Sequence, residues 1–163
     1  MTEMEVAAET FAALKHGTER GQTHSGRPYT AHLREVVEVV REFFPENDTL
    51  AVSAWLHDVC EDCEVTRDEI EARFGVDVAH LVSAVTNEPG ANRRERNAAT
   101  YPKIRAAGRD AVALKLADRI ANVSHGGSLV KMYRKEQPAF QEALRRPGEH
   151  ACMWARLNRL LAC

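Results

Sequence analysis

The sequence predicts an all-α protein, a compact multi-helix bundle. Apolar residues recur at helical spacing along most of the 163 residues. Glycines and prolines separate these periodic segments, and no stretch of useful length shows the alternation that is typical of a half-buried strand. A chain of this length can bury the core of one domain, so we expect a single domain over residues 1–163.

Each expected helix lies between residues that begin or end helices. Gly17 can end the first helix, Pro45 ends the second, and a capping box from Thr66 to Glu69 begins the fourth. A loop with three glycine or proline breakers precedes the second helix, and Pro147-Gly148 separates the last two. We expect helices over residues 4–17, 31–44, 47–59, 66–75, 76–88 and 109–127, one helix after a mobile loop at 88–96, and two helices within 128–162.

The charge balance argues against several classes of partner. The chain has 22 basic and 24 acidic residues and a net charge of −2, which offers no electrostatic attraction to nucleic acid or to a membrane surface. No apolar run approaches the ~20 residues of a membrane span. The N-terminus carries early acidic residues and no signal-peptide core, so we expect a cytoplasmic protein.

Cys60 and Cys63 form a lone C-x-x-C pair. A closed zinc site needs four ligands, and a thioredoxin-type motif sits near a βαβ pattern that this chain lacks. We therefore interpret the pair as small residues at the end of a helix.

Two strongly apolar segments carry ionisable residues. Residues 50–56 are apolar on nearly every face, which places them in the middle of the domain, and His57 and Asp58 follow directly. Glu61 and Asp62 lie one helical turn later, so all four side chains can share one patch.

The second segment, residues 111–123, is also apolar almost all round. Lys115, Asp118 and Asn122 form one continuous stripe along it. A buried carboxylate must be paired or bound to a metal, because an unpaired one is costly. An ion pair with Lys115, or with an outward Arg119, is therefore the alternative to a metal at Asp118.

A metal site explains these residues together. His57 alone could be a hydrogen-bonded core histidine, but histidine nitrogen and carboxylate oxygen on two buried helices suit a divalent transition metal. His32, near the start of a helix after a glycine and proline loop, is the candidate for a further ligand.

The order of these residues resembles the H…HD…D signature of HD-domain metal-dependent phosphohydrolases. The segments SGRPYTAHL, LHDVCED, VTRDEIEARFGVDVAHLVSAVTNE and LKLADRIAN are similar to the hydrolase domain of the RelA/SpoT alarmone enzymes and to stand-alone small alarmone hydrolases. The likeness covers roughly residues 5 to 130 and implies an all-helical bundle, in agreement with the periodicity.

The resemblance also implies roles for individual residues. It implies one Mn²⁺, or another divalent transition metal, per chain, with removal of the 3′-pyrophosphate from (p)ppGpp. The metal ligands would be His32, His57, Asp58 and Asp118, the catalytic pair Glu61 and Asp62, and the substrate contacts Asn122, Ser25 and His24.

One loop departs from that family. An Arg-Lys pair usually precedes the Ser-Gly of the loop on the purine side, and Thr23 and His24 stand there instead, so no guanidinium can stack on a base. Another nucleotide, such as a 5′-monophosphate or an adenosine alarmone, is therefore an alternative substrate. A non-catalytic nucleotide sensor and a helical scaffold with an incidental metal are the alternatives outside enzymology.

Other residues have two interpretations. Arg93, Arg94, Arg96 and Lys103 could receive phosphates or could form a solvated charge cluster. Met132, Tyr133 and Trp154 are expected in the core rather than around a substrate.

Overall fold

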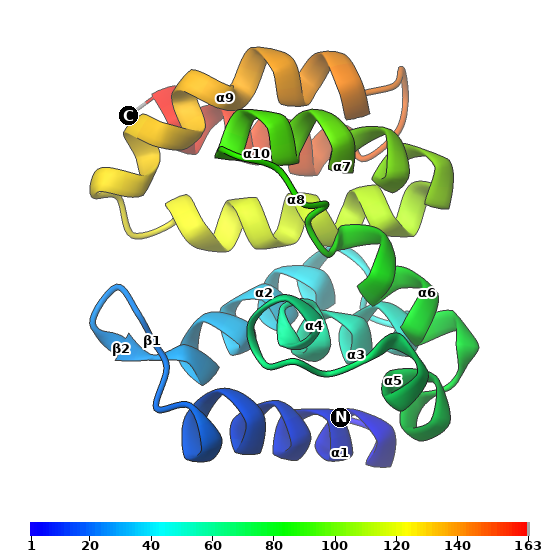
Figure 1. Cartoon of the computed structure of the whole chain (residues 1–163). Coiled ribbons are helices and arrows are strands. Elements are labelled where there is room, and N and C mark those ends of the chain that lie inside the picture. Colours follow the sequence, from blue (N-terminus) through cyan, green and yellow to red (C-terminus); the bar gives the residue numbers. More distant parts are fainter. Residues whose placement is uncertain (163) are drawn as a thin grey trace.

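Helices make up most of the structure, a computed structural model that describes residues 1–162 (Figure 1). The elements are α1 (Glu3–Ala12), the π-helix η1 (Ala13–Glu19), β1 (Thr23–His24), β2 (Arg27–Pro28), α2 (Tyr29–Phe43), α3 (Asp48–Leu56), α4 (Val59–Asp62), α5 (Arg67–Phe74), α6 (Val76–Val85), α7 (Arg93–Ala107), α8 (Arg109–Val123), α9 (Ser128–Leu144) and α10 (Ala151–Ala162). The predicted all-α class is confirmed.

Helix α8 is the centre of the bundle. Eleven of its 15 residues are buried, and it packs against α2, α3 and α6 on one side and against α7, α9 and α10 on the other. In Figure 1, α7 to α10 form the upper layer and α1 to α6 the lower one. A polar side chain of α8 that faces α2 and α3 therefore lies between the two layers.

Helix α3 is the second buried element. Leu50 through Leu56 are all buried, as the apolar run predicts. The helix stops at Leu56, however, and does not continue to residue 59. The ring Nδ1 of His57 lies 2.8 Å from the carbonyl oxygen of Ala54, the group that a continuing helix would bond to the backbone of Asp58. A short helix, α4, resumes at Val59.

Several expected boundaries shift by a few residues. The first helix passes Gly17 as the π-helix η1, and the loop at 21–29 contains a small antiparallel hairpin, β1–β2. Asn47 caps α3 by accepting from the backbone of Leu50. The Thr66 cap and the break near Pro147-Gly148 are confirmed.

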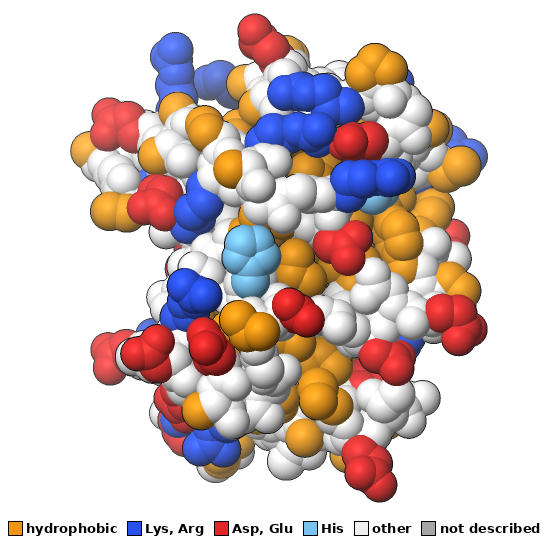
Figure 2. Space-filling view, turned by 90° about the vertical axis from the view of Figure 1, so that its right-hand side faces the viewer, with side chains coloured by type: hydrophobic (Ala, Val, Ile, Leu, Met, Phe, Trp, Pro, Cys, Tyr) orange, Lys and Arg blue, Asp and Glu red, His pale blue; other side chains and the backbone are white. Residues whose placement is uncertain are grey.

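The surface carries both signs of charge. Figure 2 shows basic and acidic side chains on one face, with the basic ones gathered over the upper layer. Among residues 1–162, no helix is long and apolar enough to cross a membrane.

Candidate metal centre and the cavity around it

Three of the four predicted metal ligands converge between the two layers. His32 comes from the first turn of α2, His57 from the end of α3 and Asp118 from the middle of α8, and all three are buried. One ligand atom from each lies within 4.8 Å of the others. Asp118 Oδ1 is 3.5 Å from His32 Nε2 and 3.7 Å from His57 Nε2.

The two histidines are arranged to bind a cation. His57 donates its Nδ1 proton to the carbonyl oxygen of Ala54, so its Nε2 faces the carboxylates of Asp58 and Asp118. That Nε2 is buried without a hydrogen-bond partner, as is Nδ1 of His32. Buried polar atoms are rarely left unpaired, so two imidazoles and a carboxylate in this state fit a divalent transition metal.

Asp58 lies at the edge of this group rather than within it. Its Oδ2 is 3.0 Å from His57 Nε2 and accepts the hydroxyl proton of Tyr29. Burial opposes ionisation of Asp58, but the His57 ring outweighs it, and the pKa of Asp58 is lowered. The side chain is thus an anion beside His57, where it can complete a coordination shell.

Asp118 has the ion pair that the alternative interpretation proposed. Lys115 Nζ lies 3.0 Å from Oδ2, while Asn122 donates to Oδ1 over 2.6 Å. Burial disfavours the charge, but Lys115 and the histidines outweigh it and hold the pKa of Asp118 well below its usual range. Lys115 occupies only Oδ2, so the ion pair and a metal on Oδ1 are compatible.

Arg119, by contrast, is not outward. Its guanidinium is 1% exposed, lies over the Phe140 ring and donates to Tyr101 and Glu136. It ties α8 to α7 and α9.

The acidic pair lies beside the metal centre but is held by different partners. Glu61 Oε1 accepts from Asn87 Nδ2 over 2.9 Å, and Asp62 Oδ2 accepts from Gln22 Nε2 over 2.7 Å. Both carboxylates line a cavity of about 170 Å³ that also contains His32, Asp58 and Asp118. A water molecule in this cavity can therefore reach both a carboxylate and a metal on the triad.

The predicted substrate contacts divide into two groups. Asn122 and His24 line the cavity, and the His24 ring stacks on His32 with 4.4 Å between centroids. Ser25 does not line it. This residue is exposed in the tight turn between β1 and β2 at φ +50°, because a two-residue connection places it at the tip of the hairpin.

The basic residues considered as phosphate contacts also lie in different places. Arg93 lines the cavity and pairs with Glu136 over 2.5 Å, whereas Lys103 is occupied by Glu88 and by the carbonyl of Thr86. Arg94 lines a neighbouring groove instead. Tyr133, expected only in the core, is buried and also lines the cavity. Trp154 is in the core as predicted.

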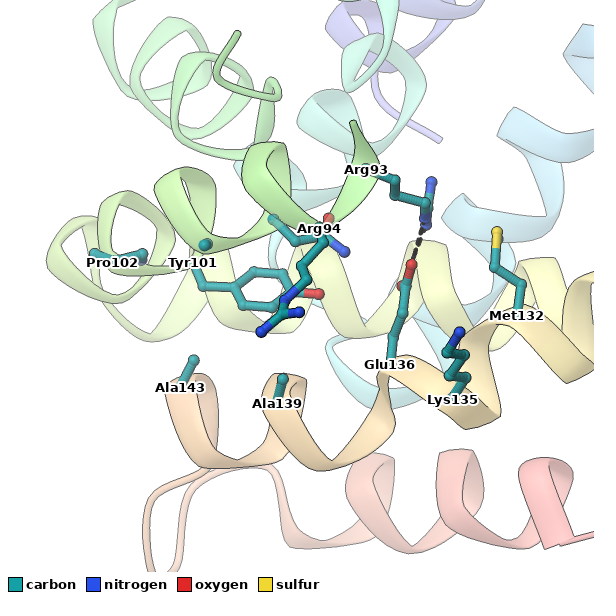
Figure 3. A pocket seen from close by; sticks show the side chains of 11 residues that line it. Arg93, Arg94, Tyr101, Pro102, Met132, Lys135, Glu136, Ala139 and Ala143 are labelled. Carbon is teal, nitrogen blue, oxygen red and sulfur yellow. Dashed lines mark hydrogen bonds and ion pairs between the residues drawn. The ribbon is translucent and has the colours of Figure 1, made fainter. Parts of the chain in front are cut away.

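That groove is larger than the polar cavity. It measures about 720 Å³, runs between α7 and α9, and has Tyr101, Met132 and Ala139 among its apolar lining (Figure 3). Arg93 and Asn97 line both the groove and the polar cavity, so the two hollows adjoin.

Tyr29, Gln22 and Asn97 have places at the site that the sequence did not suggest. Tyr29 is three residues before His32 and so shares its helix face, which was a usable signal. Gln22 and Asn97 lie in segments whose approach depends on the tertiary fold.

Comparison with known proteins points to the same family as the sequence motifs. The HD domain family matches residues 7–145. The guanosine-3′,5′-bis(diphosphate) 3′-pyrophosphohydrolase of Aquifex aeolicus is 38% identical over 119 residues, which are 71% of this chain and 17% of that protein. Human guanosine-3′,5′-bis(diphosphate) 3′-pyrophosphohydrolase MESH1 is 32% identical over 117 residues, 71% of this chain and 65% of the human protein. The chain thus spans less than two thirds of these relatives.

Two solved structures share the fold. A metazoan orthologue of SpoT, described as hydrolysing ppGpp, superposes with a TM-score of 0.83 at 24% identity and covers 99% of this chain and 96% of its own. The protein lmo0812 of Listeria monocytogenes gives a TM-score of 0.67 at 28% identity, over 85% of this chain and 96% of its own.

Proposed function

The chain belongs to the HD domain family, and from this premise we propose that it is a metal-dependent phosphohydrolase that removes the 3′-pyrophosphate from a (p)ppGpp-like alarmone. The observation that carries the proposal is the convergence of His32, His57 and Asp118 beside a cavity that His32 and Asp118 line together with two carboxylates outside the triad. The named activity of the Aquifex and human relatives supports the choice of substrate.

His32, His57 and Asp118 would hold one Mn²⁺ or another divalent transition metal, with Asp58 as the fourth ligand. Such an ion, when bound, polarises a phosphoryl oxygen and lowers the pKa of bound water. Asn122 and Lys115 hold the Asp118 carboxylate in place from both of its oxygens. Glu61 and Asp62 are the groups that orient the attacking water and accept its proton.

Positive charge for the substrate phosphates comes from Arg93 and Lys115, which both line the cavity. A cavity of about 170 Å³ is smaller than the 300–1,000 Å³ that is usual for a ligand pocket, so it can enclose the reacting phosphates but not a whole nucleotide. The nucleoside must therefore extend out of it.

A second candidate is hydrolysis of another nucleotide, such as an adenosine alarmone or a 5′-monophosphate. Thr23 and His24 favour it, since neither can stack a guanidinium on guanine, and Ser25 is exposed away from the cavity. A sensor without catalysis has less support, because a binding module does not need two carboxylates beside a metal centre.

The test is a panel of nucleotides incubated with the purified protein and Mn²⁺. The panel contains ppGpp, its adenosine counterpart and 5′-monophosphates, and pyrophosphate and phosphate are measured separately. Pyrophosphate release from ppGpp is the expected result. If only the other nucleotides are hydrolysed, one of them rather than ppGpp is the substrate. Binding without any product would favour the sensor.

A further inference from the structure

A buried histidine and a glutamine stand behind Asp62, outside the cavity. His16 lies in the π-helix η1 and is 0% exposed. Its Nδ1 is 2.9 Å from Gln22 Oε1, and Gln22 Nε2 donates to Asp62 Oδ2 over 2.7 Å. Neither His16 nor Gln22 lines the cavity, and Asp62 is the member of the acidic pair that Gln22 contacts.

The backbone fixes Gln22 on both sides. Its amide donates to the carbonyl of His16 over 2.8 Å, and its own carbonyl accepts from the amide of Tyr29 over 3.1 Å. The His16 ring also stacks on Tyr29 with 4.4 Å between centroids, and the hydroxyl of Tyr29 donates to Asp58. The glutamine therefore has little freedom to turn away from Asp62.

The direction of these hydrogen bonds follows from chemistry. An ionised carboxylate can only accept, so the amide nitrogen of Gln22 must face Asp62 and its oxygen must face His16. His16 must then carry its proton on Nδ1. Its Nε2 is left buried without a partner, and burial lowers the pKa of the ring, which keeps it neutral.

We infer that Gln22, oriented by His16, is a positioning residue that holds one oxygen of Asp62 and leaves the other to the attacking water. This inference rests on the proposed function, because it assigns Asp62 to the water. Groups behind an active-site ligand restrict its rotation, and their loss typically costs 10–100-fold in activity. A purely structural role, which anchors the hairpin to α4, would instead affect stability alone.

Gln22→Met tests the inference, since methionine keeps the length of the side chain and removes both hydrogen bonds. Gln137→Met is the matched control, because Gln137 also donates from Nε2 to a side-chain oxygen, that of Asn158, and does not line the cavity. We expect kcat of Gln22→Met to fall roughly tenfold or more, with KM and metal content unchanged. Equal kcat in the two variants would overturn the positioning role.

A second measurement does not need activity or a variant. Nitrogen-15 NMR of the histidine rings reports which nitrogen of His16 is protonated, and we expect Nδ1 in the unmodified protein. A proton on Nε2 would leave Nδ1 as an acceptor, to which Cys63 Sγ, 3.3 Å away, can donate but Gln22 Oε1 cannot, and this would overturn the orientation of Gln22 by His16. If no nucleotide is turned over, the proposed function is wrong, while the NMR result still decides the hydrogen-bond chain.

Discussion

Glu61 and the buried triad differ in what holds them. The carboxylate of Glu61 is exposed and accepts from the side chain and the backbone of Asn87, while His57 is 1% exposed and packed against Asp118. Removing the charge of Glu61 leaves no buried group without its partner. Removing His57 leaves Asp118 and Asp58 without the ring that lies between them, so the two positions should respond differently to substitution.

Glu61→Gln should separate catalysis from metal binding. We expect turnover to fall by about 10²–10⁴, the usual effect of a lost general base, because glutamine keeps the size and cannot take a proton. Metal content and Tm should stay near those of the unmodified protein. The measurements are one hydrolysis assay on the best substrate, metal analysis and a thermal melt.

Two companion variants complete that experiment. Glu71→Gln, on an exposed acid of α5, should change none of the three quantities. His57→Ala should lower metal content, Tm and turnover together. If Glu61→Gln keeps near-normal turnover, Glu61 has no role in activating water and the sensor interpretation gains support.

The cysteine pair should be unreactive. Burial raises the pKa of the Cys63 thiol to about 11, with Asp62 adding to the effect, and burial also raises the pKa of Cys60. The thiolate is the reactive form, so at pH 8 both should be alkylated by iodoacetamide more slowly than the exposed Cys152, for Cys63 by roughly tenfold or more. Mass spectrometry of a time course gives the rates, and fast labelling of Cys63 would point to the redox role that the C-x-x-C spacing did not support.

Among the helices, α8 shows which residues of the site a sequence pattern can predict. Its polar stripe was visible because Lys115, Asp118 and Asn122 interrupt an apolar helix at one face, and the structure brings them to the cavity. Gln22 and Arg93 carried no such signal. They lie on a loop and at the start of a helix, and periodicity says nothing of which distant segment they meet.

Asp118→Ala should abolish metal binding, and Asp118→Asn should weaken it strongly, because a neutral amide is a poorer ligand than a carboxylate. Both variants leave Lys115 as a half-buried cation without its pair, so Tm should fall as well. Asp110→Ala, an exposed acid on the first turn of the same helix, is the control and should retain the metal. Metal analysis of protein purified without chelator checks this, and a full metal content in Asp118→Ala would remove Asp118 from the ligand set.

The segment before α7 should be mobile without ligand. The loop expected at 88–96 is shorter in the structure, since α7 begins at Arg93, and Glu88 is held by Thr100 and Lys103. Residues 89–92 remain between these contacts and the helix. The amides of Gly90, Ala91 and Asn92 should exchange with solvent much faster than those of the buried helix 111–123, and equally slow exchange would contradict this.

At the scale of the whole molecule, the sequence predicted the bundle and the triad for one shared reason. Burying apolar faces forces α3 and α8 together, and their polar exceptions must then meet. The hairpin was not predicted, because strands of two residues leave no periodic signal. The outward position of Ser25 was not predicted either. Features set by a single turn depend on local backbone geometry that residue spacing does not encode.

The last prediction concerns stability. His32 and His57 belong to the lower layer of Figure 1 and Asp118 to the upper one, so an ion on all three would cross-link the layers. A ligand at about 100 times its Kd stabilises the folded state by about 2.7 kcal/mol. For a domain of this size, that corresponds to roughly 5–10 °C in Tm. Dialysis against a chelator should therefore lower Tm by about this amount, and added Mn²⁺ should restore it. Asp118→Ala should melt at one temperature with or without the metal. If the unmodified protein melts at the same temperature before and after chelation, with metal analysis confirming removal, the ion does not join the layers.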